Sequence, residues 1–255
     1  MENKQQELPH VGCIIPCHNH AQYVQQAMKS MVEQDYPNKT LVVVDDGSSD
    51  GSFDKAKELL TEVNKEGENL IGGLIGKADT VIIRNEEPSG PSQARNKGIQ
   101  LVRGVSHMIA PLDADDLYLP GKLSKSVGLM LTDPMRIGII YTDVLIYNEM
   151  NKTYTHEYRR PYSRDVLERE NIISNAPLLN LLALDKTGLY YEGLRTSEDW
   201  DLWLRITENF VALHIPEPLQ VYRVTGQNAT NIVNKEQWQR DWQTVYYRMQ
   251  QRKGV

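Results

Sequence analysis

Two clusters of acidic residues carry the side chains best suited to chemistry in this sequence. The first is LDADD, where Asp113, Asp115 and Asp116 directly follow the apolar run SHMIAPL. Ionised carboxylates at the end of a buried strand are costly unless their charge is compensated. Mg²⁺ or Mn²⁺ would compensate it, since such an ion takes one or two protein carboxylates and completes its shell with substrate phosphates. A surface turn or a helix cap would also explain the three acids.

The second cluster lies in TSEDWDLWLRI, with Glu198, Asp199 and Asp201 at the start of a predicted amphipathic helix. We expect Thr196 or Ser197 to cap this helix. Acids in a first turn are favoured by the helix dipole, so the cluster has a complete structural explanation. One of the carboxylates could instead act as a general base facing a nucleotide site. The residues alone leave both interpretations open.

Two further segments could recognise a nucleotide. The turn DDGSSD begins with Asp45 and Asp46, and a carboxylate there can accept the N–H group of a base such as uracil. In SGPSQARNKGI a Gly/Pro/Ser loop opens a helix that carries Arg95 and Lys97. A helix N-terminus beside a guanidinium is a good environment for a diphosphate. A plain turn and a solvated helix face are the alternatives.

Two cysteines and two histidines lie close together near the N-terminus, but their spacing favours neither a disulfide nor a zinc site. Cys13 and Cys17 are four strand residues apart, about 13 Å, which is too far for a disulfide. With His18 and His20 they would form a zinc site from a single strand end, whereas structural zinc usually takes ligand pairs from two separated segments. We expect free thiols, with Cys13 as a small core residue.

Alternating strands and helices must position these segments. We predict strands at 11–16, 41–46, 80–84 and 106–113, and helices at 21–34, 53–63 and 92–102. Apolar strands separated by helices form a parallel sheet covered on both faces. Ligands bind beyond the carboxyl ends of such strands, so the acidic turns should meet at one rim. Residues 64–79 are rich in glycine and predict a loop insertion, because Gly76-Lys77 lacks the spacing of a phosphate loop.

The second half of the chain has a different pattern. We expect a helix at 120–132, a hairpin or pair of short strands over IGIIYTDVLIYN, and a C-terminal helix from Lys235. Eleven of the 13 tyrosines and all four tryptophans lie after residue 116. Their rings could stack on sugars or bases, or could fill the core of a mixed sheet.

Composition and charge exclude several classes of protein. The chain has 255 residues, of which 40% are hydrophobic and 24% charged, as in ordinary globular proteins. A net charge of −6 argues against a nucleic-acid partner. No stretch approaches the ~18 apolar residues that span a bilayer, and the polar start MENKQQELPH is unlike a secretory signal. We therefore expect a cytoplasmic protein that contacts membranes at most peripherally, and the sequence carries no signal for its oligomeric state.

In order and spacing, these motifs resemble the inverting nucleotide-sugar glycosyltransferases of family 2, which have the GT-A fold. The resemblance runs from about Val11 to Arg223 and includes IIPCHNHAQYV, VVVDDGSSDGS, ARNKG, LDADDLYLPGKL, and SEDWDLWLRI followed by IPEPLQVYR. It implies an α/β fold with a Rossmann-like, mostly parallel central sheet flanked by helices, and a smaller mixed region on the acceptor side. It also implies a nucleotide-sugar-binding half at 1–116, an acceptor-binding and catalytic half at 117–223, and a helical tail at 224–255.

The resemblance further implies roles for individual residues. Asp199 would be the base that deprotonates an acceptor hydroxyl, with Glu198 beside it, and Asp115 would hold Mn²⁺ or Mg²⁺ against the diphosphate. Asp116 is expected to cap the helix that follows. The implied nucleotide-sugar contacts are Pro16, His18, Asn19, Asp45, Asp46, Arg95, Asp113 and Ala114. Thr225 stands where family members often have a histidine that helps the metal or diphosphate, so the protein's share of the metal shell would be incomplete.

The expected function is transfer of a sugar from a nucleotide-diphosphate donor, with UDP as the default nucleotide, to an acceptor hydroxyl with inversion. The acceptor could be a glycan, a lipid-linked sugar or a protein. One alternative is a metal-dependent nucleotidyltransferase, although such an enzyme normally has a Gly-rich basic loop where this chain reads CHNHAQ. The other is a non-catalytic protein of the same fold that binds a nucleotide sugar or a glycan.

Overall fold

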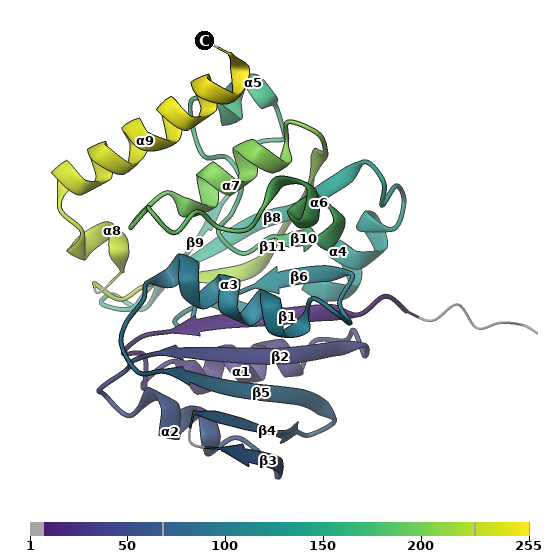
Figure 1. Cartoon of the computed structure of the whole chain (residues 1–255), viewed down its shortest axis with the longest axis vertical. Coiled ribbons are helices and arrows are strands. Elements are labelled where there is room, and N and C mark those ends of the chain that lie inside the picture. The colour runs from purple at the N-terminus through teal and green to yellow at the C-terminus, as the bar shows by residue number, and fades with distance from the viewer. Residues whose placement is uncertain (1–7, 68, 227, 255) are drawn as a thin grey trace, which may run out of the picture.

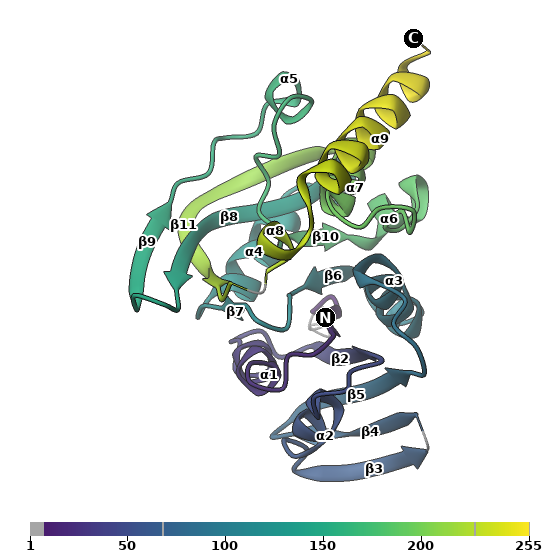
Figure 2. The same cartoon turned by 90° about the vertical axis from the view of Figure 1, so that its left-hand side faces the viewer.

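The computed structural model describes residues 8–67, 69–226 and 228–254, whose strands form one mixed sheet with helices on both faces (Figures 1 and 2). The strands of the first half are β1 (Val11–Cys17), β2 (Lys39–Asp46), β3 (Glu62–Gly67), β4 (Leu70–Ile75), β5 (Ala78–Asn85) and β6 (Met108–Pro111). Those of the second half are β7 (Leu117–Tyr118), β8 (Ile137–Asn148), β9 (Thr153–Glu157), β10 (Leu178–Asn180) and β11 (Val211–Val224). In space their order is β3-β4-β5-β2-β1-β6-β10-β8-β11-β7, and β9 pairs with β8.

The helices cover the two faces of the sheet unequally. They are α1 (Val24–Val32), α2 (Ser52–Lys57), α3 (Pro91–Val102), α4 (Lys122–Met130), α5 (Arg164–Leu167), α6 (Leu181–Thr187), α7 (Glu198–Ile206), α8 (Ala229–Ile232) and α9 (Lys235–Lys253). Side chains of α1, α2 and α4 belong to one hydrophobic core. Side chains of α3, α5, α6, α7 and α9 belong to a second core on the other face. The expected class, an α/β protein with a large sheet flanked by helices, is confirmed.

The alternation of side chains along β2 explains why two consecutive acids have different surroundings. Val43 faces the core that contains α1, whereas Val44 faces the core beneath α3. Because the side-chain period of a strand is two residues, Asp45 continues the first face and Asp46 the second. Both carboxylates are buried at the carboxyl end of the strand.

Three acidic or polar turns meet at one rim, as the sequence predicts. Strands β1, β2 and β6 are parallel neighbours, so their carboxyl ends at Cys17, Asp46 and Pro111 lie on the same edge of the sheet. Helix α3 packs closely on β1 because Gly98 has no side chain: a Cβ there would lie 2.6 Å from Ile14 Cγ2. This close approach brings the start of α3 to the rim.

Two predictions for the first half are wrong. Residues 64–79 are not a loop insertion, because β3 and β4 form an antiparallel hairpin and β4 continues the sheet beside β5. Their glycines permit close strand approach: a Cβ on Gly73 would lie 2.1 Å from the Glu62 carbonyl oxygen. The helix predicted to reach residue 63 ends at Lys57, since the following residues enter this hairpin.

A third prediction is wrong in the second half. IGIIYTDVLIYN is neither a hairpin nor two strands but the single strand β8. β8 pairs with β10, β9 and β11, and these neighbouring strands stabilise it along its whole length, so the chain does not turn within it. The predicted C-terminal helix is confirmed as α9. One sheet crosses residue 116, so the division into a donor half and an acceptor half stays a prediction.

Two smaller predictions concern cysteine chemistry and membrane spans. Cys13 and Cys17 are both free and buried, and burial raises the pKa of each thiol to about 12. No helix in the described ranges has both the length and the apolar character needed to cross a membrane.

Candidate functional site

The rim of the parallel strands opens into a cavity of about 840 Å³. This volume lies within the range of sites for small molecules and cofactors. The walls come from the ends of β1 and β2, the start of α3, the turn after β6, the start of α7 and Trp238 of α9. Ten of the eleven site residues implied by the sequence line it: Pro16, His18, Asn19, Asp46, Arg95, Asp113, Ala114, Asp115, Glu198 and Asp199.

Asp45 is the implied site residue that lies outside the cavity lining. Its carboxylate points to the other face of the sheet, where Oδ2 lies 3.4 Å from Arg84 Nε and accepts a 3.3 Å hydrogen bond from Ser48 N–H. Burial raises the pKa of Asp45 despite these contacts. These contacts tie Oδ2 of Asp45 to the turn after β2, whereas its Oδ1 is buried with no hydrogen-bond partner among the described residues, and its nucleotide contact stays a prediction.

Asp46 faces the cavity but already has many protein donors. Its carboxylate accepts hydrogen bonds from the backbone N–H groups of Ser89 and Gly90, and from side chains of Ser89 and Asn85, at 2.6–3.0 Å. Burial alone would raise the pKa of Asp46, but these donors lower it. Asp46 therefore fixes the loop that leads into α3. Beside it, His18 Nδ1 lies 2.7 Å from the Asp46 carbonyl oxygen.

Arg95 joins three walls of the cavity. Its Nη1 donates to Glu198 Oε1 at 2.7 Å and its Nη2 to Asp113 Oδ1 at 2.6 Å, while its guanidinium lies 5.3 Å from the centre of the Tyr190 ring. The Arg95 side chain is 8% exposed and that of Glu198 12%, whereas that of Asp113 is 30% exposed, so the pair with Glu198 is the better shielded from water. Arg95 thus links α3, the turn after β6 and the start of α7.

The three acids of LDADD have different surroundings. Asp113 pairs with Arg95, which lowers its pKa against the opposing effect of burial. Asp116 is 1% exposed and accepts from the N–H of Arg223 at 2.9 Å and from Asn175 Nδ2 at 2.9 Å. The prediction that Asp116 caps the next helix is therefore wrong. Helix α4 begins at Lys122, after a glycine, and Asp116 instead ties the acidic turn to β11.

Asp115 is the acid that fits a divalent cation. Its carboxylate lines the cavity, and burial together with the charge of Asp113 raises its pKa. In the described part of the chain no ion pair neutralises it, whereas Asp113 has Arg95. An uncompensated carboxylate oxygen is what Mg²⁺ and Mn²⁺ prefer. No group of three or more His, Cys, Asp or Glu side chains among the described residues could hold a metal, so most ligands would come from the diphosphate and water.

Asn228 lies beside Asp115, near the segment where family members often have a histidine. Its Nδ2 is 3.2 Å from Asp115 Oδ2, and its Oδ1 accepts from the N–H of Thr225 at 2.8 Å. Arg223 Nε donates to the backbone carbonyl of Asp115 at 2.8 Å. The sequence predictions missed Asn228, whose signal was its place just after the YR motif of β11.

Asp199 lies in the first turn of α7 and faces the cavity. Its Oδ1 accepts from the N–H of Trp200 at 2.6 Å, and its Oδ2 accepts from Asn171 Nδ2 at 3.1 Å. Burial, followed by the charge of Glu198, raises the pKa of Asp199 to about 6. A carboxylate with this pKa is ionised at neutral pH yet basic enough to accept a proton.

The start of α7 is held in an unusual backbone conformation. Ser197 has φ of +59°, in the left-handed region, and its side chain makes no capping hydrogen bond. The hydroxyl of Thr196 donates to Asp241 Oδ2 of α9 at 2.9 Å. Ser197 therefore occupies the N-cap position of α7, as predicted, but its side chain makes no capping hydrogen bond. Strained residues of this kind persist where the surroundings hold them, often beside functional groups.

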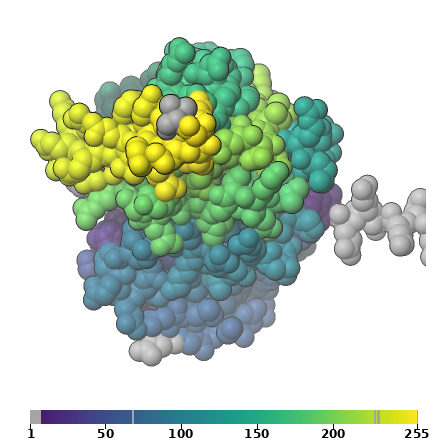
Figure 3. Space-filling view, turned by 45° about the horizontal axis from the view of Figure 1, so that its top comes forward, coloured from purple at the N-terminus to yellow at the C-terminus, as the bar shows by residue number. Residues whose placement is uncertain are grey.

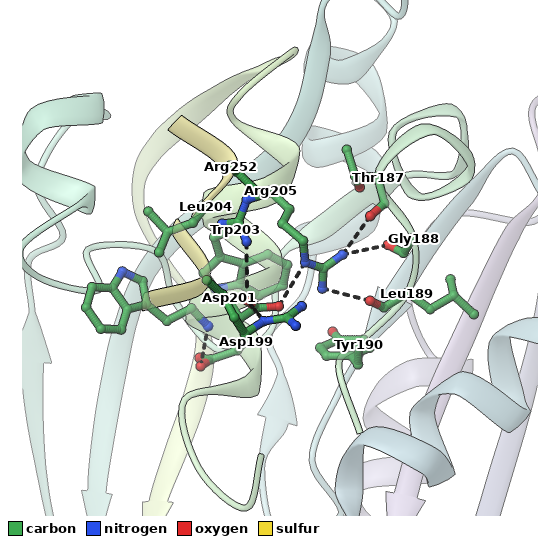
Figure 4. A network of polar contacts seen from close by, with 12 residues as sticks. Thr187, Gly188, Leu189, Tyr190, Asp199, Asp201, Trp203, Leu204, Arg205 and Arg252 are labelled. Carbon is green, nitrogen blue, oxygen red and sulfur yellow. Dashed lines mark hydrogen bonds and ion pairs between the residues drawn. The ribbon is translucent and has the colours of Figure 1, made fainter. Parts of the chain in front are cut away.

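Helix α9 supplies that support. Asp241 is 3% exposed, and its Oδ2 also accepts from the N–H groups of Arg195 and Thr196 at 3.2 and 2.9 Å. One turn into α7, buried Asp201 binds Arg248 of α9 and Arg205, each at 2.8–2.9 Å. Arg205 in turn donates to the carbonyls of residues 187, 188 and 189 (Figure 4).

Comparison with known proteins identifies the architecture and its relatives. The sequence profile described as Glycosyl transferase family 2 matches residues 13–184. An uncharacterized glycosyltransferase of Rickettsia felis is 29% identical over 224 residues, which cover 84% of this chain and 34% of the relative. The chain thus spans about a third of that relative's length.

Two solved structures share the fold. TarS of S. aureus, in complex with UDP-GlcNAc, superposes with a TM-score of 0.66 at 14% identity, covering 88% of this chain and 61% of TarS. The mannosyltransferase PcManGT of Pyrobaculum calidifontis, in complex with GDP-Man and Mn²⁺, has a TM-score of 0.64 at 19% identity, covering 88% and 59%. The fold is therefore that of the GT-A glycosyltransferases.

Proposed function

The chain belongs to glycosyl transferase family 2, and we propose that it transfers a sugar from a UDP-sugar to an acceptor hydroxyl with inversion at the anomeric carbon. The observation that carries this proposal is the placement of Asp199, with a pKa of about 6, in the same cavity as Asp115. One carboxylate can accept a proton while the other faces the diphosphate. The nucleotidyltransferase alternative is set aside, because the family is a different one.

The donor occupies the rim of the parallel strands in this proposal. Pro16, His18 and Asn19 form the wall for the base, and Ala114 and Asp113 form the floor for the ribose. TarS, which shares the fold, was solved with UDP-GlcNAc, and PcManGT, which shares it equally, with GDP-Man. The choice of UDP therefore rests on the acids after β2, where a carboxylate can accept the N–H group of uracil. Arg95 is a positioning residue in this proposal, because its two ion pairs hold the carboxylates of Asp113 and Glu198 in place.

The metal ligand on the protein is Asp115. A divalent cation bound there would supply positive charge to the leaving diphosphate; PcManGT, which shares the fold, was solved in complex with GDP-Man and Mn²⁺. Asn228 contacts the same carboxylate and orients it. A threonine stands at 225, and the cavity that Asp115 lines also contains His20.

The reaction follows from the position of Asp199. Its carboxylate removes the hydroxyl proton of the acceptor as that oxygen attacks the anomeric carbon. The bond from the anomeric carbon to the diphosphate oxygen breaks, and the nucleoside diphosphate leaves with the electron pair. Attack from the face opposite the leaving group inverts the anomeric configuration. Glu198, held by Arg95, keeps negative charge beside Asp199 and so keeps its pKa raised.

Two measurements test this proposal. First, thermal unfolding is followed with UDP, GDP, dTDP and their sugars, with and without Mn²⁺; UDP compounds should give the largest stabilisation and Mn²⁺ should increase it. Second, the anomeric configuration of the product or of the released sugar is read by proton NMR, and inversion relative to the donor is expected. Retention would contradict the single displacement. Binding without any turnover would favour the non-catalytic alternative.

A further inference from the structure

We propose that Lys122 positions the acidic turn LDADD from inside the core, through a hydrogen-bond chain that runs in one direction to the wall of the cavity. The chain passes from Lys122 through the side-chain amides of Gln220 and Asn175, and we call these three residues the amide relay. The inference rests on the proposed function, because the turn that the relay holds carries Asp115, the proposed metal ligand. It adds a positioning role for a lysine that lies outside the cavity lining.

The first residue of α4 is a lysine inside the core. Lys122 is 1% exposed, and its Nζ lies 5.0 Å from the centre of the Tyr118 ring. Burial lowers the pKa of Lys122 well below the usual range of a lysine. Both acceptors of its Nζ are neutral, Thr142 Oγ1 at 2.9 Å and Gln220 Oε1 at 2.8 Å. Burying an amine without a carboxylate partner costs free energy that an apolar side chain of similar length would not, which points to a role beyond filling space.

The relay extends the hydrogen bonding of this amine to the acidic turn. Gln220 of β11 is 1% exposed, and its Nε2 donates to Asn175 Oδ1 at 2.9 Å. Asn175 lines the cavity, and its Nδ2 donates to Asp116 Oδ2 at 2.9 Å and to Asp113 Oδ2 at 3.2 Å. These two acids stand on either side of Asp115 in the sequence. One amide group thus holds a carboxylate on each flank of the proposed metal ligand.

Only one orientation of the two amides satisfies both ends of the relay. At the inner end, the hydroxyl of Thr142 donates to a backbone carbonyl, so its oxygen accepts from Lys122. At the outer end, Asp113 belongs to an ion pair, and a carboxylate only accepts, so the NH₂ group of Asn175 faces it. The oxygen of Asn175 then faces Gln220, whose own oxygen faces the amine. An apolar residue at 122 would remove the inner donor and leave both amides free to rotate.

The cavity is supported from both faces of the sheet. Helix α9 packs on one face, where it forms part of the molecular surface (Figure 3). Its Asp241 holds the backbone ahead of α7. Helix α4 packs on the opposite face, and its first residue begins the relay. Different layers of the protein therefore support the proposed base and the proposed metal ligand, so a change in the relay should disturb the acidic turn and leave the start of α7 intact.

The test replaces both partners of the inner hydrogen bond at once. In Lys122→Met/Gln220→Met, apolar side chains of similar length take their places, a change that can be nearly neutral for stability. Asn175 keeps its contacts with the acids but loses its donor. Thr142→Val is the matched control, because it removes the other acceptor of Lys122 in the same core and leaves the relay unbroken. Lys122→Met alone is the second relay variant, and it decides if the double variant does not fold.

Binding of UDP to the whole chain is measured by calorimetry with Mn²⁺ and with EDTA, well below the unfolding temperature of each variant. The wild type and Thr142→Val should gain the same factor in UDP affinity from Mn²⁺. The double variant should bind UDP about tenfold more weakly in Mn²⁺, the usual effect of losing a group that orients a metal ligand, and should keep its affinity in EDTA. Lys122→Met should change the affinity in the same direction. A purely structural role would lower the unfolding temperature and leave the ratio of the two affinities unchanged.

A second readout does not depend on the metal. The side-chain amide signal of Asn175, observed by ¹⁵N NMR without UDP, should be the same in the wild type and Thr142→Val and should shift or broaden in the relay variants. A wild-type affinity ratio in the relay variants would overturn the proposal. Failure of both relay variants to fold would also overturn it, by assigning the relay to stability alone. If the wild type gains no UDP affinity from Mn²⁺, the proposed metal site fails instead, and the Asn175 signal then decides on the relay.

Discussion

Replacing Asp199 by asparagine should separate its chemistry from its contribution to the fold. If Asp199 is the base that accepts the acceptor proton, Asp199→Asn should lower kcat for sugar transfer by about 10²- to 10⁴-fold, the usual contribution of a positioned general base. The substitution keeps shape, and Asn Oδ1 can still accept from the N–H of Trp200. The new amide group can donate to Asn171 Oδ1, which is buried and has no partner among the described residues, once the Asn171 amide rotates.

The same variant should not lose stability at neutral pH. The pKa of Asp199 is about 6 in the folded protein against an ordinary 3.8, so the ionised form is disfavoured by folding. Because the folded state holds its proton to higher pH, stability falls as pH rises from about 4 to 6 and stays lower above that. A difference of roughly two pKa units corresponds to at most about 3 kcal/mol. Asparagine carries no such charge, so Asp199→Asn should be as stable as the wild type below about pH 4 and up to that much more stable at pH 8.

The assay combines transfer kinetics at saturating donor, calorimetric binding of UDP with Mn²⁺, and thermal unfolding at about pH 3.5, below the ordinary pKa of an aspartate, and at pH 8. The expected pattern is lost transfer, unchanged UDP affinity and an unfolding temperature that is raised at pH 8. Transfer within about tenfold of the wild type would refute the assignment of the base. Lost transfer together with a lowered unfolding temperature would show that the substitution damaged the fold, and the kinetic argument would then fail.

Three further predictions concern the same cavity. The wild-type value of kcat/KM should fall about tenfold for each pH unit below 6, because the base must be ionised, and a profile that is flat down to pH 4.5 would contradict this. Asp115→Asn should weaken UDP binding at least about tenfold in Mn²⁺ but not in its absence; calorimetry with and without the metal decides, and equal affinities would argue against metal bridging. Asp241→Asn should lower kcat more than it changes the KM of the donor, and should cost about 1–3 kcal/mol of stability, because its carboxylate holds the backbone ahead of Asp199. An unaltered kcat would mean that α9 does not position the base.

Motif order in the sequence was sufficient to find the cavity, because parallel strands bring their carboxyl ends together whatever lies between them. The partners of the acids were not predictable in the same way. Asn175 contacts Asp113 and Asp116 from about 60 residues away, and Asn228 contacts Asp115 from more than 110. Neither asparagine sits in a pattern that local periodicity can detect.

The misassigned elements share a physical cause. The region after Lys57 reads as helix by its apolar spacing, but pairing between β3 and β4 outweighs that local preference. Asp45 and Asp46 are the same residue type in consecutive positions, yet the alternation of side chains along β2 places them on opposite faces of the sheet. Because β2 is buried on both faces, the two carboxylates have different surroundings. Asp116 reads as a cap, whereas its partner is the backbone of β11, far along the chain.

The double pairing of Arg95 has a consequence for which anions the cavity admits. Asp113 and Glu198 already satisfy its guanidinium, and Asp115 and Asp199 add negative charge to the same walls. A bare phosphate therefore meets carboxylates at the Arg95 wall, while Arg195 is a cation on the lining that no ion pair among the described residues engages. Under the proposed function, a diphosphate that arrives with a divalent cation brings the counter-charge that Arg95 could supply only by breaking its two ion pairs.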